Sequence, residues 1–143
     1  KANPHWQTLD GAQVLVIFNG PHAYISPTWY EQGPAVPTWN YGAVHVRGKV
    51  ELLDEVQTLD LVYRTVDAYE PGLPMKEGVW DQRYNDKLVK GIVGLKISDL
   101  RWQGKLKLGQ NRSAQDQAGI RLGLAQRGGG NDSGLLRLMD SFL

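Results

Sequence analysis

Apolar residues in two early segments follow the spacing of β-strands. The first segment covers residues 13–19 and is rich in β-branched side chains, and Tyr24-Ile25 extends it beyond a bend at Gly20-Pro21. The second covers residues 40–53, where alternate residues from Val44 to Leu52 are apolar and the residues between them are charged. This alternation predicts a long strand with one buried and one solvated face. Gly42 and Gly48 mark bulges or close approaches within it.

Helical spacing and capping residues predict the elements that follow. Asp54, with Gln57 three residues later, predicts a capping box that opens a helix over residues 55–69. Near the start of the chain, Asn3 predicts the cap of a short helical turn over residues 3–9, with Pro4 at its first position. The remaining predicted elements are a short helix over 79–89, a strand over 92–100 that continues through 102–108 across Gly104, a helix over 114–126 capped by Ser113, and an amphipathic helix over 133–143.

These elements predict a mainly β or α+β fold. A long aromatic connection joins the first two strands and a packing helix crosses from the second strand to the next, and we expect a mostly antiparallel, barrel-like sheet with peripheral helices. The last helix has apolar residues mostly on one side, so it docks either on its own barrel or on a partner subunit. We expect one domain over residues 1–127 and treat residues 128–143 as this C-terminal helix.

Composition excludes several classes of protein. The 143 residues contain no cysteine, which rules out disulfides, iron–sulfur clusters and thiolate zinc sites. The formal net charge is +1, and there is no run of Lys or Arg to attract nucleic acid. No apolar run reaches the length of a membrane span and no signal-peptide pattern opens the chain, so we expect a cytoplasmic protein. His5, His22 and His45 are too scattered to predict a metal site.

The segment from Gly20 to Tyr41 carries the strongest signal for a binding site. It holds two of the five tryptophans and three of the six tyrosines. Hydroxyl and amide side chains are interleaved with these aromatics, at Ser26, Thr28, Thr38 and Asn40. Tyr and Trp offer a flat apolar face with one polar edge, which suits a flat and partly polar ligand. The alternative is that the aromatics simply fill one end of a barrel.

Two further groups of residues offer weaker signals. Lys107 and Arg112, with Gln110 and Asn111 between them, follow the end of a predicted strand. They could hold a phosphate or the edge of an electron-rich ring, or they could be a charged surface turn. Lys1 and Asn3 lie at a helix start, where a cation and backbone N–H groups can bind an anion.

The chain resembles the PaiB-like family, described as FMN-binding negative transcriptional regulators. The resemblance extends in order from Lys1 to about Leu124. Four phrases carry it: Lys1-Ala-Asn-Pro-His-Trp, Val16-Ile-Phe-Asn-Gly-Pro-His-Ala-Tyr-Ile-Ser-Pro-Thr-Trp-Tyr30, Val36-Pro-Thr-Trp-Asn-Tyr41 and Gly104-Lys-Leu-Lys-Leu-Gly-Gln-Asn-Arg112.

This resemblance implies a split β-barrel like that of pyridoxamine-phosphate oxidases, usually a homodimer with FMN at the subunit interface. Family members begin with additional strands before the Lys-Ala-Asn-Pro phrase, so the resemblance also implies a barrel that is incomplete at its N-terminus. The cofactor-binding residues that it implies are Lys1 and Asn3 near the phosphate; Ser26, Trp29, Tyr30, Thr38, Asn40 and Tyr41 along the flavin wall; and Lys107, Gln110, Asn111 and Arg112 in a closing motif.

Three functions remain open at this stage. The first is a flavin or redox sensor that acts as a negative transcriptional regulator, and we expect any action on DNA to be indirect. The second is an FMN-dependent oxidoreductase that acts on a small substrate. The third is a split barrel that has no flavin and binds another flat ligand, such as haem.

Overall fold

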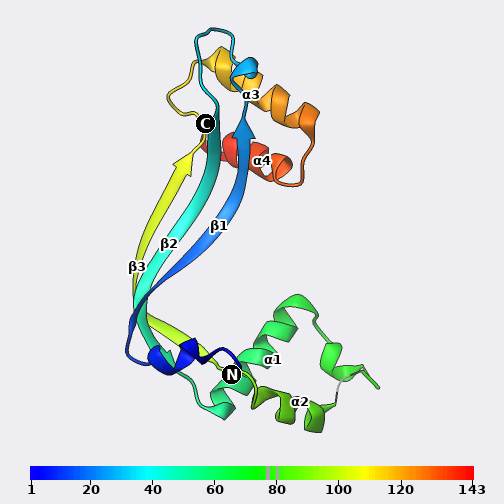
Figure 1. The fold of residues 1–143 in the computed structure, drawn as a ribbon. Coiled ribbons are helices and arrows are strands. Elements are labelled where there is room, and N and C mark those ends of the chain that lie inside the picture. Colours follow the sequence, from blue (N-terminus) through cyan, green and yellow to red (C-terminus); the bar gives the residue numbers. More distant parts are fainter. Residues whose placement is uncertain (77, 80) are drawn as a thin grey trace. The chain divides into compact units, whose positions relative to one another are not determined.

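The computed structural model describes residues 1–76, 78–79 and 81–143 of the chain. Its strands and helices follow one another as shown in Figure 1. The elements are η1 (Pro4–Thr8), β1 (Gln13–Ile25), η2 (Pro27–Trp29), β2 (Thr38–Leu52), α1 (Glu55–Tyr69), η3 (Leu73–Met75), α2 (Gln82–Val89), β3 (Leu95–Lys107), α3 (Ala114–Arg127) and α4 (Asp132–Phe142), where η denotes a 3₁₀-helix.

The three strands form one antiparallel sheet with β2 in the middle (Figure 1). Close to the start of β1, the Gly11 N–H donates to the Val50 carbonyl at 2.9 Å and the Val50 N–H donates to the Ala12 carbonyl at 2.9 Å. Two residues, Gly11 and Ala12, thus oppose the single residue Val50, and Gly11 has a φ of 73°, which is the pattern of a glycine β-bulge between antiparallel strands. The sheet and its helices confirm the predicted α+β class.

The chain forms two compact units. Unit 1 comprises Lys1–Leu15 and Arg47–Arg101, and unit 2 comprises Val16–Val46 and Trp102–Leu143. Each strand of the sheet therefore contributes residues to both units. The separation of residues 1–127 from 128–143 stays a prediction.

Helix α1 of unit 1 begins with the predicted capping box. The Asp54 carboxylate accepts from the Gln57 N–H at 2.8 Å, and the Gln57 side chain accepts from the Asp54 N–H at 3.1 Å. The buried residue of this helix is Thr58, and a Cβ at Gly94 would lie 2.4 Å from its hydroxyl oxygen. The apolar residues that follow at helical spacing are half-buried, whereas Val56 is 78% exposed; the half-buried residues are Leu59, Val62, Tyr63 and Val66. The helix therefore packs through this apolar stripe together with the tight contact at Thr58.

Two predicted boundaries in unit 1 need correction. The short helix predicted over 79–89 begins at Gln82, because the Asp81 side chain caps it by accepting from the Tyr84 N–H at 2.9 Å; Trp80 lies outside the described residues. Strand β3 begins at Leu95, whereas the alternation predicted a start at residue 92. Turn hydrogen bonds from Gly91 and Ile92 to the carbonyls of Leu88 and Val89 occupy that segment instead.

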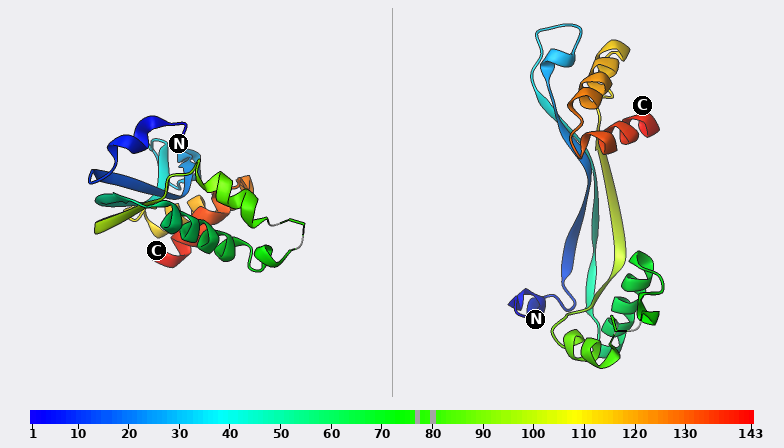
Figure 2. Two further views of the ribbon diagram at one scale, coloured as in Figure 1. Left: turned by 90° about the horizontal axis from the view of Figure 1, so that it is seen from below. Right: turned by 90° about the vertical axis from the view of Figure 1, so that its right-hand side faces the viewer.

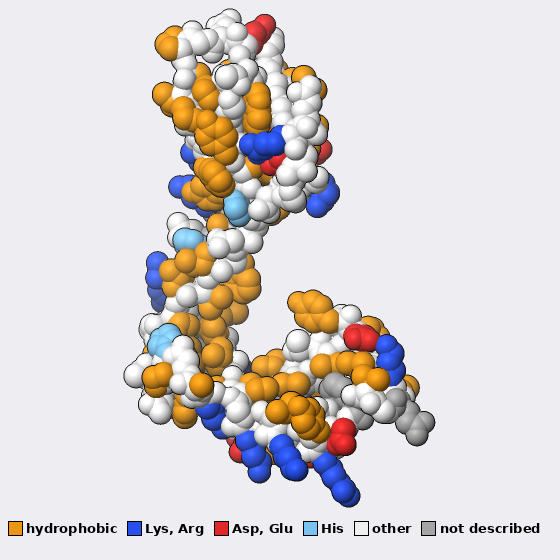
Figure 3. Space-filling model, turned by 45° about the vertical axis from the view of Figure 1, so that its right-hand side comes forward, with side chains coloured by type: hydrophobic (Ala, Val, Ile, Leu, Met, Phe, Trp, Pro, Cys, Tyr) orange, Lys and Arg blue, Asp and Glu red, His pale blue; other side chains and the backbone are white. Residues whose placement is uncertain are grey.

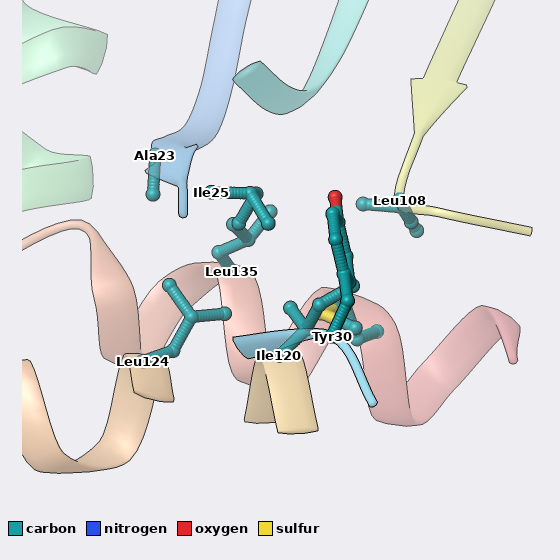
Figure 4. Close-up of a cluster of buried hydrophobic side chains, with 8 residues drawn as sticks. Ala23, Ile25, Tyr30, Leu108, Ile120, Leu124 and Leu135 are labelled. Atoms are coloured by element: carbon teal, nitrogen blue, oxygen red, sulfur yellow. The ribbon is translucent and has the colours of Figure 1, made fainter. Parts of the chain in front are cut away.

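Helices α3 and α4 pack against each other and against the strands of unit 2 (Figures 1 and 2). Figure 4 shows the resulting core, in which side chains from β1, α3 and α4 converge with Tyr30 and Leu108. The last helix thus docks on its own unit through Leu135 and Met139, both 0% exposed. The core residues are Ala23, Ile25, Tyr30, Leu108, Ile120, Leu124, Leu135 and Met139.

One ion pair closes the connection between α3 and α4. The Arg127 guanidinium donates to both carboxylate oxygens of Asp132, at 2.8 and 2.6 Å. Its third nitrogen donates to the Tyr24 carbonyl of β1 at 3.0 Å, and its carbon lies 5.1 Å from the Trp29 ring centroid. Between the helices, Gly128 has a φ of 65°, a left-handed conformation that glycine adopts readily.

This arrangement shifts the pKa values of both partners. The hydrogen bonds from Arg127 lower the pKa of Asp132, against the opposing effect of burial, and the Gly129 N–H adds to the lowering. The same hydrogen bonds raise the pKa of Arg127. Both shifts favour the charged pair in the folded state.

The part of the chain that the structure describes has neither a membrane-spanning helix nor a clustered metal site. None of its helices is long and apolar enough to cross a membrane. Across the same described ranges, no group of three or more His, Cys, Asp or Glu side chains is arranged to hold a metal ion.

We expect Asp132→Asn to destabilise unit 2 strongly. The variant leaves the Arg127 charge against a carbonyl and an aromatic ring without its counter-ion, and breaking such a partly buried pair costs about 2–4 kcal/mol. Asp140→Asn is the matched control, because Asp140 pairs with Arg121 while 66% of its side chain is exposed. That change should cost less than about 1 kcal/mol. Thermal unfolding of the three proteins measures the difference, and equal losses would contradict the assignment.

The same variant should alter the dependence of stability on pH. Because the folded-state pKa of Asp132 is lowered, the pair contributes fully above the unfolded-state pKa of about 3.9 and loses its contribution as the pH falls through the folded value. The wild-type protein should therefore lose more stability than Asp132→Asn below pH 4. Denaturant titrations between pH 3 and 7 measure this difference.

Candidate functional site

One face of the sheet in unit 2 carries exposed aromatic side chains. His22 and Tyr24 alternate with the buried Ala23 and Ile25 on β1, so they lie on the face opposite the core. On β2, Trp39 and Tyr41 share a face by the same alternation. We call His22, Tyr24, Trp39 and Tyr41 the aromatic face.

Trp39 lies at the centre of this face. Its ring stacks on His22 with centroids 5.7 Å apart and an interplanar angle of 27°, and Tyr24 approaches it edge-on at 6.4 Å. The indole N–H donates to His22 Nδ1 at 3.3 Å. Trp39 remains 48% exposed and Tyr24 41% exposed, and Figure 3 shows hydrophobic side chains lying beside histidine on the surface. A shallow cavity of about 410 Å³ lies here, lined by His22, Trp39, Tyr41 and His45 among others.

Two cations lie on neighbouring parts of the same unit. Lys107, the last residue of β3, donates to the Thr38 hydroxyl at 2.6 Å, and Thr38 directly precedes Trp39 on β2. The Arg112 guanidinium lies over the Tyr30 ring, 4.1 Å from its centroid, and its nearest carboxylate oxygen, on Asp116, is 3.9 Å away. We call Thr38, Lys107 and Arg112 the basic end. Both cations retain hydrogen-bond donors that could hold an anion.

Asn40 is the buried polar residue of this region. It is 1% exposed, and its amide nitrogen has no hydrogen-bond partner among the residues that the structure describes. The nitrogen lies 3.8 Å from where a Cβ at Gly109 would stand, in the turn that leads to Arg112. A buried donor without a partner costs about 1–3 kcal/mol. Asn40 is thus a donor that the described chain leaves unused.

Trp29 is held by the packing of α3. A Cβ at Gly119 would lie 2.0 Å from the Trp29 carbonyl oxygen, and a Cβ at Gly123 would lie 2.3 Å from the indole ring. The ring therefore fits against the helix only because Gly123 lacks a side chain, and the Trp29 backbone only because Gly119 lacks one. Tyr30 is 9% exposed and belongs to the core, where its ring supports Arg112.

The other predicted residues differ in how their polar groups are used. Ser26 caps η2, accepting from the Thr28 N–H at 3.2 Å. Both ends of the Gln110 amide bind backbone, the Leu108 N–H at 2.8 Å and the Leu106 carbonyl at 2.9 Å. Asn111 is exposed. Their roles as cofactor-binding residues stay predictions.

Lys1 and Asn3 belong to unit 1. The Asn3 side chain accepts from the His5 N–H at 3.0 Å and caps η1, as predicted. The Lys1 backbone amine donates to the Gly91 carbonyl. Their proposed contact with a phosphate also stays a prediction.

The predicted site residues omit Trp39, which the structure places at the centre of the exposed aromatic face. The signal that could have found it is its period-two spacing from Tyr41 on a strand whose alternate residues, such as Asn40, are buried.

FMN needs cations for its phosphate, aromatic surface for its ring and polar groups at the ring edge. The residues of unit 2 fit these needs. Lys107 and Arg112 supply cations, Trp39 and Tyr41 supply aromatic surface, and Asn40 supplies an unused donor.

Comparison with known proteins identifies the family of the chain. The family model named "Putative FMN-binding domain" matches residues 1–98. The chain is 38% identical over 122 residues to the "Protease synthase and sporulation protein PAI 2" of Bacillus subtilis, covering 82% of this chain and 58% of that protein. It is 33% identical over 141 residues to an uncharacterized protein of Aspergillus fumigatus, covering 81% of this chain and 53% of that protein.

The chain thus spans somewhat more than half the length of these curated relatives. The match confirms the predicted resemblance and is consistent with a split barrel. This protein belongs to the FMN-binding domain family that includes the PaiB-like proteins, and the cofactor of that family is FMN.

Proposed function

We propose that the protein binds FMN on unit 2, with the flavin ring against the aromatic face and the phosphate at the basic end. The observation that carries this proposal is the exposure of Trp39, an indole that is stacked on one side and open on the other. Burying large aromatic rings stabilises a protein, so leaving one half exposed beside a cavity favours a ring-shaped ligand.

Each group of side chains would have a distinct task. Trp39 and Tyr41 bind the ring by stacking, and His22 fixes the indole by accepting its N–H. Lys107 and Arg112 neutralise the phosphate with charge-assisted hydrogen bonds. Asn40 lies on the opposite face of β2 from Trp39 and Tyr41, near Gly109 in the turn that leads to Arg112, so its unused amide can serve the ligand only from the basic end. FMN itself supplies one- and two-electron transfer when bound.

We propose that the biological role is regulatory, with the redox state of the flavin as the signal for negative control of transcription. The relative from Bacillus subtilis is named for protease synthesis and sporulation, which supports a regulatory role. The formal net charge is +1 and the chain has no run of Lys or Arg, so its overall attraction for DNA is weak. We therefore expect the effect on DNA to pass through a partner.

The second candidate is an FMN-dependent oxidoreductase that acts on a small substrate. The observation that favours it is the openness of the aromatic face, where a cavity of about 410 Å³ leaves room beside Trp39 and His45. Under this alternative, a nicotinamide cofactor should bleach the flavin band under anaerobic conditions.

We also propose a homodimer. An apolar groove of about 440 Å³ lies on unit 2, lined by Phe18, Val44, Leu138 and Phe142 among others. Phe18 is 58% exposed and Phe142 is 61% exposed. Apolar patches of this kind commonly mark protein–protein contacts, and a second copy of the chain is the occupant that the family resemblance favours.

Retention of flavin by the purified protein tests the proposed site. After incubation with FMN and desalting, the wild-type protein should keep the flavin absorbance bands, whereas Trp39→Ala and Lys107→Gln should bind FMN about tenfold more weakly, because each loses about 1.4 kcal/mol of stacking or charge-assisted bonding. Lys107→Gln should also lose the preference for FMN over riboflavin.

Arg121→Gln is the control for this experiment. Arg121 is a cation of the same unit, but it pairs with Asp140 and takes no part in the proposed site. Its FMN affinity should equal that of the wild type. A colourless wild-type protein would contradict the proposal and would favour a split barrel that binds another flat ligand, such as haem.

The second prediction concerns the subunit contact. Phe18→Asp should convert a dimer into a monomer, because it places a charge in the apolar groove without touching the buried core. Light scattering coupled to size-exclusion chromatography measures the mass, and Val36→Asp, at another exposed apolar residue outside the groove, is the control. A monomeric wild type would overturn the proposed dimer.

The third prediction concerns nucleic acid. The purified protein should bind oligonucleotides weakly and without sequence preference, since the formal net charge is only +1 and the chain has no run of Lys or Arg to attract phosphates. Electrophoretic mobility shifts at several salt concentrations test this. A nanomolar, salt-resistant and sequence-selective shift would show that the protein reads DNA directly.

A further inference from the structure

Strand β3 contains an irregularity that changes which of its side chains share a face. In a regular strand, residues three apart point to opposite faces. In unit 1, however, the Ile97 and Leu100 side chains both approach Gly48. A Cβ atom placed on Gly48 would lie 2.5 Å from the Ile97 side chain and 3.2 Å from the Leu100 side chain. One extra residue must therefore be accommodated between them, as in a β-bulge. Asp99 lies in this interval and has a φ of 53°.

A left-handed backbone at a residue other than glycine is uncommon, although Asp tolerates it better than most. Such positions often occur where a bulge redirects a side chain beside a functional site. Here the bulge places Leu100 on the face of Ile97, so Arg101 turns to the opposite face. Without the extra residue, Arg101 would share the face of Ile97.

The redirected residues line a pocket on unit 1. Arg47 of β2 lies on the face opposite the buried Val46 and Gly48, and it meets Arg101 and Asp99 of β3 there. Gln13 of β1 completes the lining, so three neighbouring strands contribute. The pocket has a volume of about 600 Å³, which is within the range for small-molecule sites.

The charges in this pocket are not neutralised within the described chain. Neither Arg47 nor Arg101 forms an ion pair with a described carboxylate, and Asp99 pairs with no described cation. Elsewhere on β2 and β3, Glu51 is already paired with Lys96 at 3.6 Å. Two like charges on adjacent strands destabilise a sheet, which favours an anion between them.

We propose that this pocket binds a phosphate monoester that carries hydroxyl groups, such as a sugar phosphate or a nucleotide. Arg47 and Arg101 hold the phosphate from two strands, since guanidinium groups match phosphate geometry. Asp99 accepts a hydrogen bond from a ligand hydroxyl, and the Gln13 amide can bind a second polar group. The site uses residues of unit 1 alone, so it goes beyond the FMN site proposed on unit 2.

The test uses ribose 5-phosphate, inorganic phosphate and ribose as probes, with isothermal titration calorimetry of the purified protein. Ribose 5-phosphate should bind, and Arg47→Gln and Arg101→Gln should each weaken it about tenfold or more, as expected for losing a charge-assisted pair. Lys49→Gln is the matched control, because Lys49 is a cation on the same face of β2 that does not line the pocket.

Asp99→Gly separates the role of the carboxylate from that of the bulge. Glycine adopts a positive φ without strain, so the strand geometry and the thermal stability should be kept. The variant should bind inorganic phosphate at least as well as the wild type, because a negative charge is removed. It should lose the preference for ribose 5-phosphate over inorganic phosphate, and an unchanged preference would overturn the role of Asp99.

A parallel FMN titration distinguishes this site from the flavin site. FMN affinity that is unchanged in Arg101→Gln, while ribose 5-phosphate binding is lost, supports a separate site. Loss of both would show that the pocket receives the phosphate of the flavin, which overturns the proposal of a separate site. No binding of ribose 5-phosphate to the wild type, or equal binding by all variants, would overturn the pocket as a phosphate site.

Discussion

The ion pair between Arg127 and Asp132 is the constraint on which unit 2 depends. A single guanidinium binds the start of α4, the Tyr24 carbonyl of β1 and the ring of Trp29. It thereby fixes the two helices against the strand whose outward side chains, His22 and Tyr24, contribute to the aromatic face. The geometry of the proposed flavin site is therefore set partly from the far side of the sheet.

The same alternation of side chains supplies both the core and the site. Ala23 and Ile25 fill the core beneath α3 and α4, and the residues between them face outward. Among the described residues, all of the largest fully buried side chains belong to unit 2, while unit 1 relies on tight contacts such as that of Thr58 with Gly94. Rigid packing lies beneath the aromatic face, as a site that must hold a flat ligand requires.

Local chemistry explains what could be predicted from the sequence. Capping at Asp54 and Ser113 depends on neighbouring residues, so the predicted helix starts were correct. The bulge at Asp99 was missed, because alternation and the glycine at residue 104 suggested an irregularity elsewhere, and only the contacts with Gly48 on another strand reveal it. The central place of Trp39 was missed for a similar reason. Trp29 and Trp39 occur in similar phrases, and their exposure is decided by α3, which comes much later in the chain.

The fit of Trp29 against α3 has a consequence for how this sequence can change over generations. The indole occupies the space that a side chain at Gly123 would need, and the Trp29 carbonyl occupies the space that a side chain at Gly119 would need. Enlarging Gly123 expels the ring, enlarging Gly119 displaces the Trp29 backbone, and shrinking the ring leaves a void that Gly123 cannot fill. Trp29 and the two glycines, which come much later in the chain, therefore constrain one another during evolution. A change at one of these positions selects for compensating changes at the others.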